Sequence, residues 1–398
     1  MSRTPSLPRR VTTPPPRRHS LDPKAIRRFV ADLVGDDLHA LQVLSLADGV
    51  TGVLNATSLA VHAIGEGLAA ARGLEPKHAI KQFDRLLSNT GIDAATLSRE
   101  WVRFVVAKRP EIVVAIDWTD FDDDDQTTIV LNLITRHGRA TPLLWKTVAK
   151  ASLAKKRNDF EDELLLQLRG AVSKTVSVTI LADRGFGDQK LYAFLKELGF
   201  HFVIRFRGNI LVTAADGPSQ TAAQWLHPGG RLRELRGATV TADHTPVDRI
   251  VLVRAAGMKD AWYLASDRTD LTGAQIKKLY GRRFSIEENF RDTKDLHFGM
   301  GLSATHITKP ERRDRLLFLV ALAIALLTLL GAASERLGLD RKLKVNTVAK
   351  RTHSLFRQGS FWYSAIPNMK PERLRSLMKT FQELLNEHNL FRGIFGEI

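Results

Sequence analysis

The hydrophobic pattern of the first part of the chain is typical of helices. Apolar side chains recur there every three or four residues, beginning with Ile26, Phe29, Val30 and Leu33. We therefore predict a helical domain over residues 23–108. Residues 1–22 lack this pattern and are rich in proline and arginine, which predicts a flexible basic arm.

The pattern changes near residue 111, where short β-branched runs replace the helical spacing. The predicted order is three strands, helix, strand, helix, strand. Three consecutive strands can form a meander, and later strands can join it in parallel through helices, which predicts a mixed sheet. The predicted strands are 112–116, 127–135, 141–148, 176–181 and 201–206, and the predicted helices are 159–170 and 189–198.

The second half of the chain changes texture again. Residues 207–268 hold short strand-like runs separated by turn residues, which predicts a β-rich insertion within one α/β domain over 109–335. A long amphipathic helix is predicted at 272–297. Residues 336–398 are predicted to form a helical C-terminal region, a candidate for dimerisation.

An uncharged apolar segment of 18 residues covers 316–333. Its length reaches the lower limit for a membrane span. A helix buried on all sides in a large protein has the same pattern, and charged residues flank this segment closely. We interpret it as a core helix and predict no membrane association.

Composition adds a strong bias towards positive charge. The formal net charge is +16 and the sequence pI is ≈ 10.1. A surplus this large indicates a polyanionic partner, either nucleic acid or an anionic membrane surface. The absence of cysteine excludes disulfides, thiolate zinc sites and a cysteine nucleophile, and it is compatible with a reducing cytoplasm.

Part of this charge forms a stripe on one predicted helix. Lys77, Lys81 and Arg85 follow one another at intervals of four residues and so share a helix face. Such a face would suit a helix lying on DNA. An ordinary solvated face has the same pattern, and the sequence leaves both interpretations open.

Two aspartates follow predicted strands. Asp117 comes directly after the strand 112–116, and Asp183 comes after the strand 176–181. If those strands are neighbours, the two carboxylates come within range of a shared metal ion. An aspartate after a strand is also a common turn residue or helix cap, so neither position alone identifies a site.

The helix predicted at 272–297 carries charges inside its apolar face. At about 100° per residue, four side chains fall within about 60° of one another: Tyr280, Arg283, Glu287 and Lys294. Burying a charge without a partner is costly, so these groups must face each other, a metal ion or a phosphate. An internal ion pair between Arg283 and Glu287 is the simplest alternative.

These residues resemble the DDE transposases of the insertion sequence 4 family. The helix has the spacing of that family's Y-R-E-K signature: Tyr280-x2-Arg283-x3-Glu287-x6-Lys294. Asp117 and Asp183 correspond to its first and second acidic motifs. The resemblance implies an α/β, RNase H-like mixed sheet with helices on both faces, interrupted by the β-rich insertion and flanked by helical N- and C-terminal regions. Residues 109–335 would be the catalytic domain, and 23–108 would bind DNA.

The resemblance also implies a reaction. Asp117, Asp183 and Glu287 would be catalytic and would bind two Mg²⁺ ions, with Mn²⁺ as an alternative metal. The implied protein is a cut-and-paste transposase that acts on double-stranded DNA, both the terminal inverted repeats of its element and the target. It would work as a homodimer in a synaptic complex, in the bacterial cytoplasm at the nucleoid.

Further DNA contacts follow from the same resemblance. Arg283, Lys294 and the Tyr280 hydroxyl would hold phosphates near the cut. Trp262 and Phe284 stand where the family places aromatic residues against a flipped base, although core packing would explain both.

Two features stay open at the level of sequence. Arg184 could contact DNA or pair with a catalytic carboxylate. The acidic cluster within residues 120–125 could assist Asp117 or could cap the turn between two strands. A nuclease that never joins DNA, or a non-catalytic DNA-binding protein derived from a transposase, would share most of these features.

Overall fold

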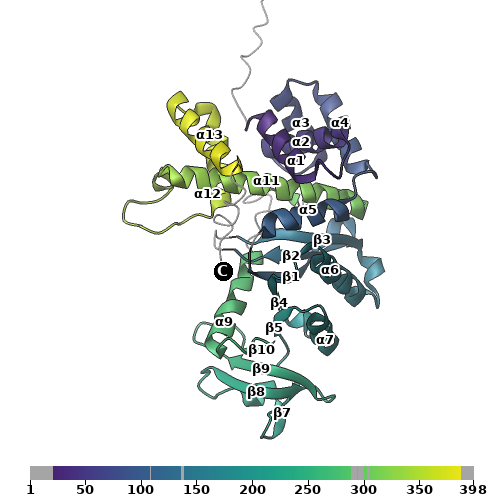
Figure 1. Ribbon diagram of the computed structural model, residues 1–398, viewed down its shortest axis with the longest axis vertical. Coiled ribbons are helices and arrows are strands. Elements are labelled where there is room, and N and C mark those ends of the chain that lie inside the picture. Colours follow the sequence, from purple (N-terminus) through teal and green to yellow (C-terminus); the bar gives the residue numbers. More distant parts are fainter. Residues whose placement is uncertain are drawn as a thin grey trace, which may run out of the picture.

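A computed structural model describes residues 21–107, 109–135, 139–287, 294, 300–302 and 305–386. Its α-helices are α1 (Pro23–Val34), α2 (Ala40–Asn55), α3 (Val61–Arg72), α4 (Pro76–Ser88), α5 (Ala94–Val106), α6 (Arg157–Ala171), α7 (Gln189–Glu197), α8 (Ala222–Trp225), α9 (Gly273–Gly281), α11 (Pro310–Arg336), α12 (Leu355–Ala365) and α13 (Pro371–Asn386). In Figure 1, α1 to α4 and α13 lie on one side of the long helix α11, and the sheet lies on the other.

The strands form a single mixed sheet with the order β3-β2-β1-β4-β5-β10-β9-β8-β6-β7. The strands are β1 (Glu111–Phe121), β2 (Gln126–Leu133), β3 (Thr141–Ala149), β4 (Ser177–Ala182), β5 (His201–Arg205), β6 (Leu211–Thr213), β7 (Ser219–Thr221), β8 (Arg233–Val240), β9 (Thr245–Val253) and β10 (Trp262–Ser266). The predicted meander β1-β2-β3 is antiparallel, and β4 and β5 continue the sheet in parallel from β1. The predicted α/β class and mixed sheet are confirmed.

Alternate residues of the central strands enter two different cores, as the two-residue period of a strand requires. On β1, Ile112 and Val114 belong to the larger core, which also contains side chains of α5, α6 and α11. Val113 and Ala115 belong to a smaller core, in which Ile276 of α9 is buried. The sheet is therefore covered by helices on both faces, with α9 on the face that the odd-numbered residues of β1 share.

Several details go beyond or differ from the sequence-based predictions. β1 is longer than predicted, so Asp117 lies inside it and pairs with Val130 instead of following the strand. The strands of the predicted β-rich insertion join the central sheet, because β10 pairs with β5. The helix predicted at 272–297 is interrupted: α9 ends at Gly281, and a 3-10 turn, η4 (Arg282–Phe284), follows it. The rest of that prediction falls mostly outside the described residues. The sequence also gave no indication of β7 and α8, which are only three and four residues long.

The apolar segment is the central part of α11 and forms the middle of the helical core. The most apolar window of this helix is 94% buried inside the protein, as expected for the core helix of a soluble protein. Its closest partner is α12, which crosses it where Gly331 faces Gly359. A Cβ at either position would collide with the backbone of the other helix, so glycine permits the close crossing.

Candidate functional site

Sheet register brings Asp117 and Asp183 to the same place. In the parallel pair of β1 and β4, Ala115 lies opposite Leu181, and each aspartate is two residues further along its strand direction. Asp183 has extended backbone angles, so the alternation of β4 continues to it. Both side chains therefore lie on the face of the sheet that α9 covers. The condition on which this site depends, that the first and fourth strands are neighbours, is therefore met.

Arg283 reaches both aspartates from the turn after α9. Its Nη2 lies 2.8 Å from Oδ2 of Asp117 and 3.8 Å from Oδ2 of Asp183. The Arg283 side chain is only 8% exposed. The interpretation of an Arg283–Glu287 pair therefore gives way to a contact between elements, because η4 directs the guanidinium towards the sheet.

Electrostatics link the acidic groups of this site. Burial raises the pKa of the Asp117 carboxyl to about 6, while the Arg283 guanidinium acts in the opposite direction. The negative charges of Asp183 and Glu287 raise the same pKa further. A cation placed among these three carboxylates would remove that repulsion, so the donor set suits divalent metal ions, which prefer carboxylate oxygens.

The three acids do not form a closed cage within the described residues. Within the part of the chain that the structure describes, no three acidic or histidine side chains are close enough together to hold a metal ion. Glu287 is exposed at the end of the described helical turn. Asp183 also accepts a hydrogen bond of 2.7 Å from the backbone of Gly185, which caps the 3-10 turn η3 (Arg184–Phe186). Arg184, the first residue of this turn, is exposed.

Tyr280 belongs to an aromatic group beside the site. It is 2% exposed, and burial raises the pKa of its hydroxyl to about 12. The ring of Trp262 meets Tyr280 edge-on at 5.0 Å and stacks on Phe284 at 5.9 Å. Phe284 is 44% exposed, so this group combines core packing at Tyr280 with an open aromatic face at Phe284.

The side chain of Lys294 contacts β1 beyond Asp117, near the end of the strand. Its Nζ donates a 3.0 Å hydrogen bond to Oγ1 of Thr119 and another to the carbonyl of Asp120. It also lies 4.4 Å from the ring centre of Phe121. Burial lowers the pKa of Lys294. The structure thus holds this cation at the far end of β1, in contact with Thr119, Asp120 and Phe121.

Two aspartates of the acidic cluster within residues 120–125 pair with cations of the protein itself. Asp124 is almost fully buried and pairs with Arg313 of α11, and it accepts a 3.1 Å hydrogen bond from the backbone of Ile307. Asp122 pairs at the surface with Lys150. Arg313 was not among the site residues predicted from the sequence. A charge at the start of the apolar segment of α11 needs a buried partner, which is the signal that could have found it.

The comparison with known families bears on this arrangement. Residues 142–326 match the family model described as Transposase DDE domain. The match runs from β3 into α11 and so includes Asp183, Arg283 and Glu287, whereas Asp117 precedes it. No curated protein matches the chain. The match supports a DDE transposase family, whose members are metal-dependent enzymes that cleave DNA.

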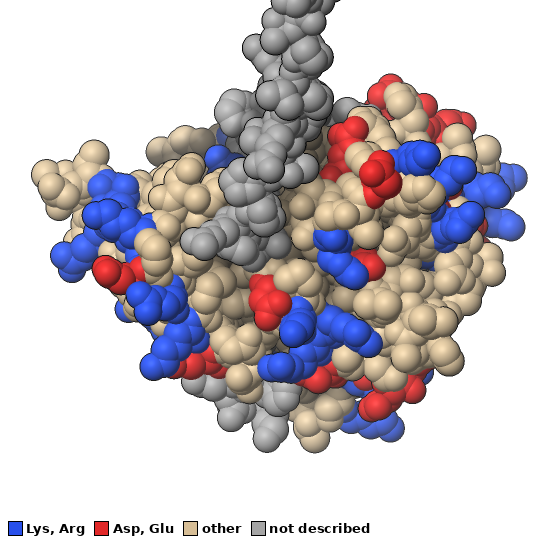
Figure 2. All heavy atoms as spheres, turned by 90° about the horizontal axis from the view of Figure 1, so that it is seen from above, with Lys and Arg blue, Asp and Glu red and all other residues tan. Residues whose placement is uncertain are grey.

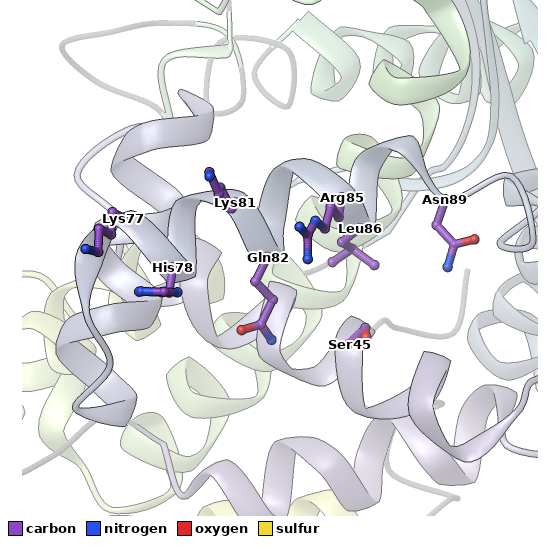
Figure 3. A pocket seen from close by; sticks show the side chains of 8 residues that line it. All are labelled: Ser45, Lys77, His78, Lys81, Gln82, Arg85, Leu86 and Asn89. Carbon is purple, nitrogen blue, oxygen red and sulfur yellow. The ribbon is translucent and has the colours of Figure 1, made fainter.

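A second candidate surface lies on the helices that precede the DDE domain match. A groove of ≈ 970 Å³ runs along α4 and is lined by Ser45, Lys77, His78, Lys81, Gln82, Arg85, Leu86 and Asn89. Figure 3 shows the basic side chains spaced along α4, with Ser45 on a neighbouring helix. The view from above in Figure 2 shows Lys and Arg in several groups with fewer acidic residues between them. The lysine and arginine side chains therefore give this surface groove a positive charge.

The groove has a fixed wall. Gln82 donates a 2.9 Å hydrogen bond to Asp48 of α2, which also pairs with Arg72 of α3. These contacts tie α4 to two neighbouring helices. Lys77, Lys81 and Arg85 are exposed on the same helix and line the same groove. A helix held in place by its neighbours that presents exposed cations is well suited to contacting a phosphate backbone.

Proposed function

We propose that this protein is a cut-and-paste DNA transposase of the insertion sequence 4 family, which binds element ends and cleaves and joins DNA strands with two metal ions. The observation that carries the proposal is the register of β1 and β4, which sets Asp117 and Asp183 side by side under Arg283. The match to the transposase DDE domain supports it independently.

Asp117, Asp183 and Glu287 are the residues that would hold Mg²⁺ or Mn²⁺. When bound, two such ions activate the attacking hydroxyl and stabilise the leaving oxygen of an in-line displacement. Arg283 and the Tyr280 hydroxyl would orient a DNA phosphate beside these carboxylates. Lys294, at the far end of β1, would contact the DNA backbone further from these carboxylates. The stacked rings of Trp262 and Phe284 offer a platform for an unpaired base.

The groove on α4 would hold the DNA backbone at a distance from the cut, through Lys77, Lys81 and Arg85. Arg184 is exposed next to Asp183 and would contact DNA closer to the site. In this proposal residues 23–108 are the DNA-binding domain, 109–335 the catalytic domain and 336–398 a dimerisation region. Two protomers would join two element ends in a synaptic complex in the bacterial cytoplasm.

The experiment is a cleavage assay on DNA that carries the element ends. The purified protein should nick at the element boundary in Mg²⁺ or Mn²⁺. Asp117→Asn, Asp183→Asn and Glu287→Gln should each abolish the nick while DNA binding is retained. Asp122→Asn is the matched control, because Asp122 is 82% exposed in the neighbouring turn. Cleavage that survives all three changes would refute the assignment.

A second assay separates transposition from plain hydrolysis. A pre-cut end with a free 3′-hydroxyl is supplied together with a target plasmid. A transposase should give joined products, and these should disappear in Asp183→Asn. Nicking without any joined product would show a nuclease on the same fold.

A further inference from the structure

The contact of Arg283 with the two aspartates has a consequence for metal binding. The guanidinium of arginine stays charged at any pH that proteins tolerate. Its Nη2 lies 2.8 Å from one oxygen of Asp117 and 3.8 Å from one oxygen of Asp183. Under the proposed function, divalent metal ions would bind to these same carboxylate oxygens. Arg283 and the metal ions therefore compete for the same negative charge.

The position of Arg283 leaves some of its hydrogen-bonding capacity unused. Within the described residues, its Nε is buried and has no hydrogen-bond partner. The separation of 3.8 Å from Asp183 is too long for a hydrogen bond. A phosphate group could accept two parallel hydrogen bonds from the planar guanidinium, which is the geometry that arginine favours.

We propose that Arg283 is an internal counter-ion that couples metal binding to phosphate binding, an inference that rests on the proposed function. Without DNA, it neutralises Asp117 and Asp183 and weakens their affinity for divalent cations. A DNA phosphate draws the guanidinium away and frees the carboxylates for metal. By linkage, bound metal must then strengthen phosphate binding by the same factor.

The test measures metal affinity and needs no turnover. Free Mn²⁺ is followed by electron paramagnetic resonance while Mn²⁺ is titrated into the full-length protein without DNA. Arg283→Gln should bind Mn²⁺ at least about fivefold more tightly than the wild type, the lower end of typical coupling factors. Lys174→Gln removes the same charge from an exposed turn at the opposite end of β4 and should leave the affinity unchanged.

The coupling itself is measured by repeating the titration with a short blunt-ended duplex, with binding to the duplex alone subtracted. The duplex should tighten Mn²⁺ binding by the wild type and should no longer do so in Arg283→Gln. Arg283→Lys keeps the charge without the planar fork and provides a second variant if Arg283→Gln does not fold. Its affinity for Mn²⁺ should lie between those of the wild type and the glutamine variant.

The two proposals fail in different ways. An Mn²⁺ affinity that is lost in Asp117→Asn but not increased in Arg283→Gln overturns the counter-ion role alone. An Mn²⁺ affinity of Arg283→Lys at or below that of the wild type would also overturn the counter-ion role alone. Mn²⁺ binding that is identical in Asp117→Asn and the wild type shows that the carboxylates are not the metal site, and both proposals then fall.

Discussion

Arg313, whose side chain has no exposed surface, pairs with Asp124, whose side chain is 5% exposed. Arg313 also donates a 2.9 Å hydrogen bond to Gln126 and lies 3.9 Å from the ring centre of Phe121. These contacts join the start of α11 to the turn between β1 and β2. They fix the end of the strand that carries Asp117.

Removing one partner of this buried pair should be strongly destabilising. Arg313→Met leaves the carboxylate of Asp124 buried without its cation, which typically costs about 3–5 kcal/mol. Urea unfolding measures the loss. Arg336→Met, at the exposed end of the same helix, should change stability by less than about 0.5 kcal/mol. Equal stabilities of the two variants would show that the buried pair is dispensable.

Asp314, the next residue, should make stability depend on pH. Burial raises the pKa of its carboxyl from 3.8 to about 7, although it accepts a 2.9 Å hydrogen bond from the backbone of Thr147. The folded state therefore holds a proton that the unfolded state has lost between these pH values. This contribution to stability is present at low pH and is lost as the pH rises towards 7.

Asp314→Asn should remove that dependence, since the amide oxygen can still accept from Thr147. The free energy of unfolding of the variant, relative to the wild type, should increase between pH 5 and pH 8. Glu311→Gln on the exposed side of the same helix turn controls for the loss of one negative charge. A difference that stays constant over this range would contradict the raised pKa.

The sequence predicted the fold better than it predicted the contacts within the site. The order of strands and helices along the chain and the mixed sheet follow from hydrophobic patterns and connection rules, which act locally. The adjacency of β1 and β4 was left open by the sequence. The meeting of Arg283 with Asp117 joins residues 166 positions apart. Helical periodicity favoured Glu287 as its partner, because the 3-10 turn at η4 leaves no mark in residue spacing.

The partners of Arg313 and Lys294 could not be predicted from the sequence for a similar reason. Both are cations next to or within apolar segments, and the sequence shows that each needs a partner. Which partner each takes depends on how α11 lies on the sheet. Only the three-dimensional packing places Phe121 between them, at 4.4 Å from Lys294 and 3.9 Å from Arg313.

The crossing of α11 and α12 should tolerate no side chain at Gly359. A Cβ there would collide with the carbonyl of Leu327, and backbone cannot move aside as a side chain can. We expect Gly359→Ala to lower the free energy of unfolding by at least about 1–3 kcal/mol, as measured by urea denaturation. Gly170→Ala is the matched control, because that helical glycine faces open space. It should be neutral or stabilise by up to about 1 kcal/mol. A neutral Gly359→Ala would mean that the helices do not approach this closely.

The groove on α4 should contribute to DNA affinity through charge alone. Each cation that contacts a phosphate releases bound counter-ions, so the logarithm of the binding constant falls with the logarithm of salt concentration. Single changes Lys77→Gln, Lys81→Gln and Arg85→Gln should each reduce that slope by about 0.9. Fluorescence anisotropy with labelled duplex DNA at several salt concentrations measures it.

The control for these variants is Arg375→Gln, an exposed cation on α13 outside the groove. It removes the same charge from the protein but should leave the slope unchanged. If the groove variants and Arg375→Gln behave alike, DNA responds to net charge and not to this surface. If the groove variants weaken binding equally for related and unrelated sequences, the groove positions the duplex while other residues read the element end.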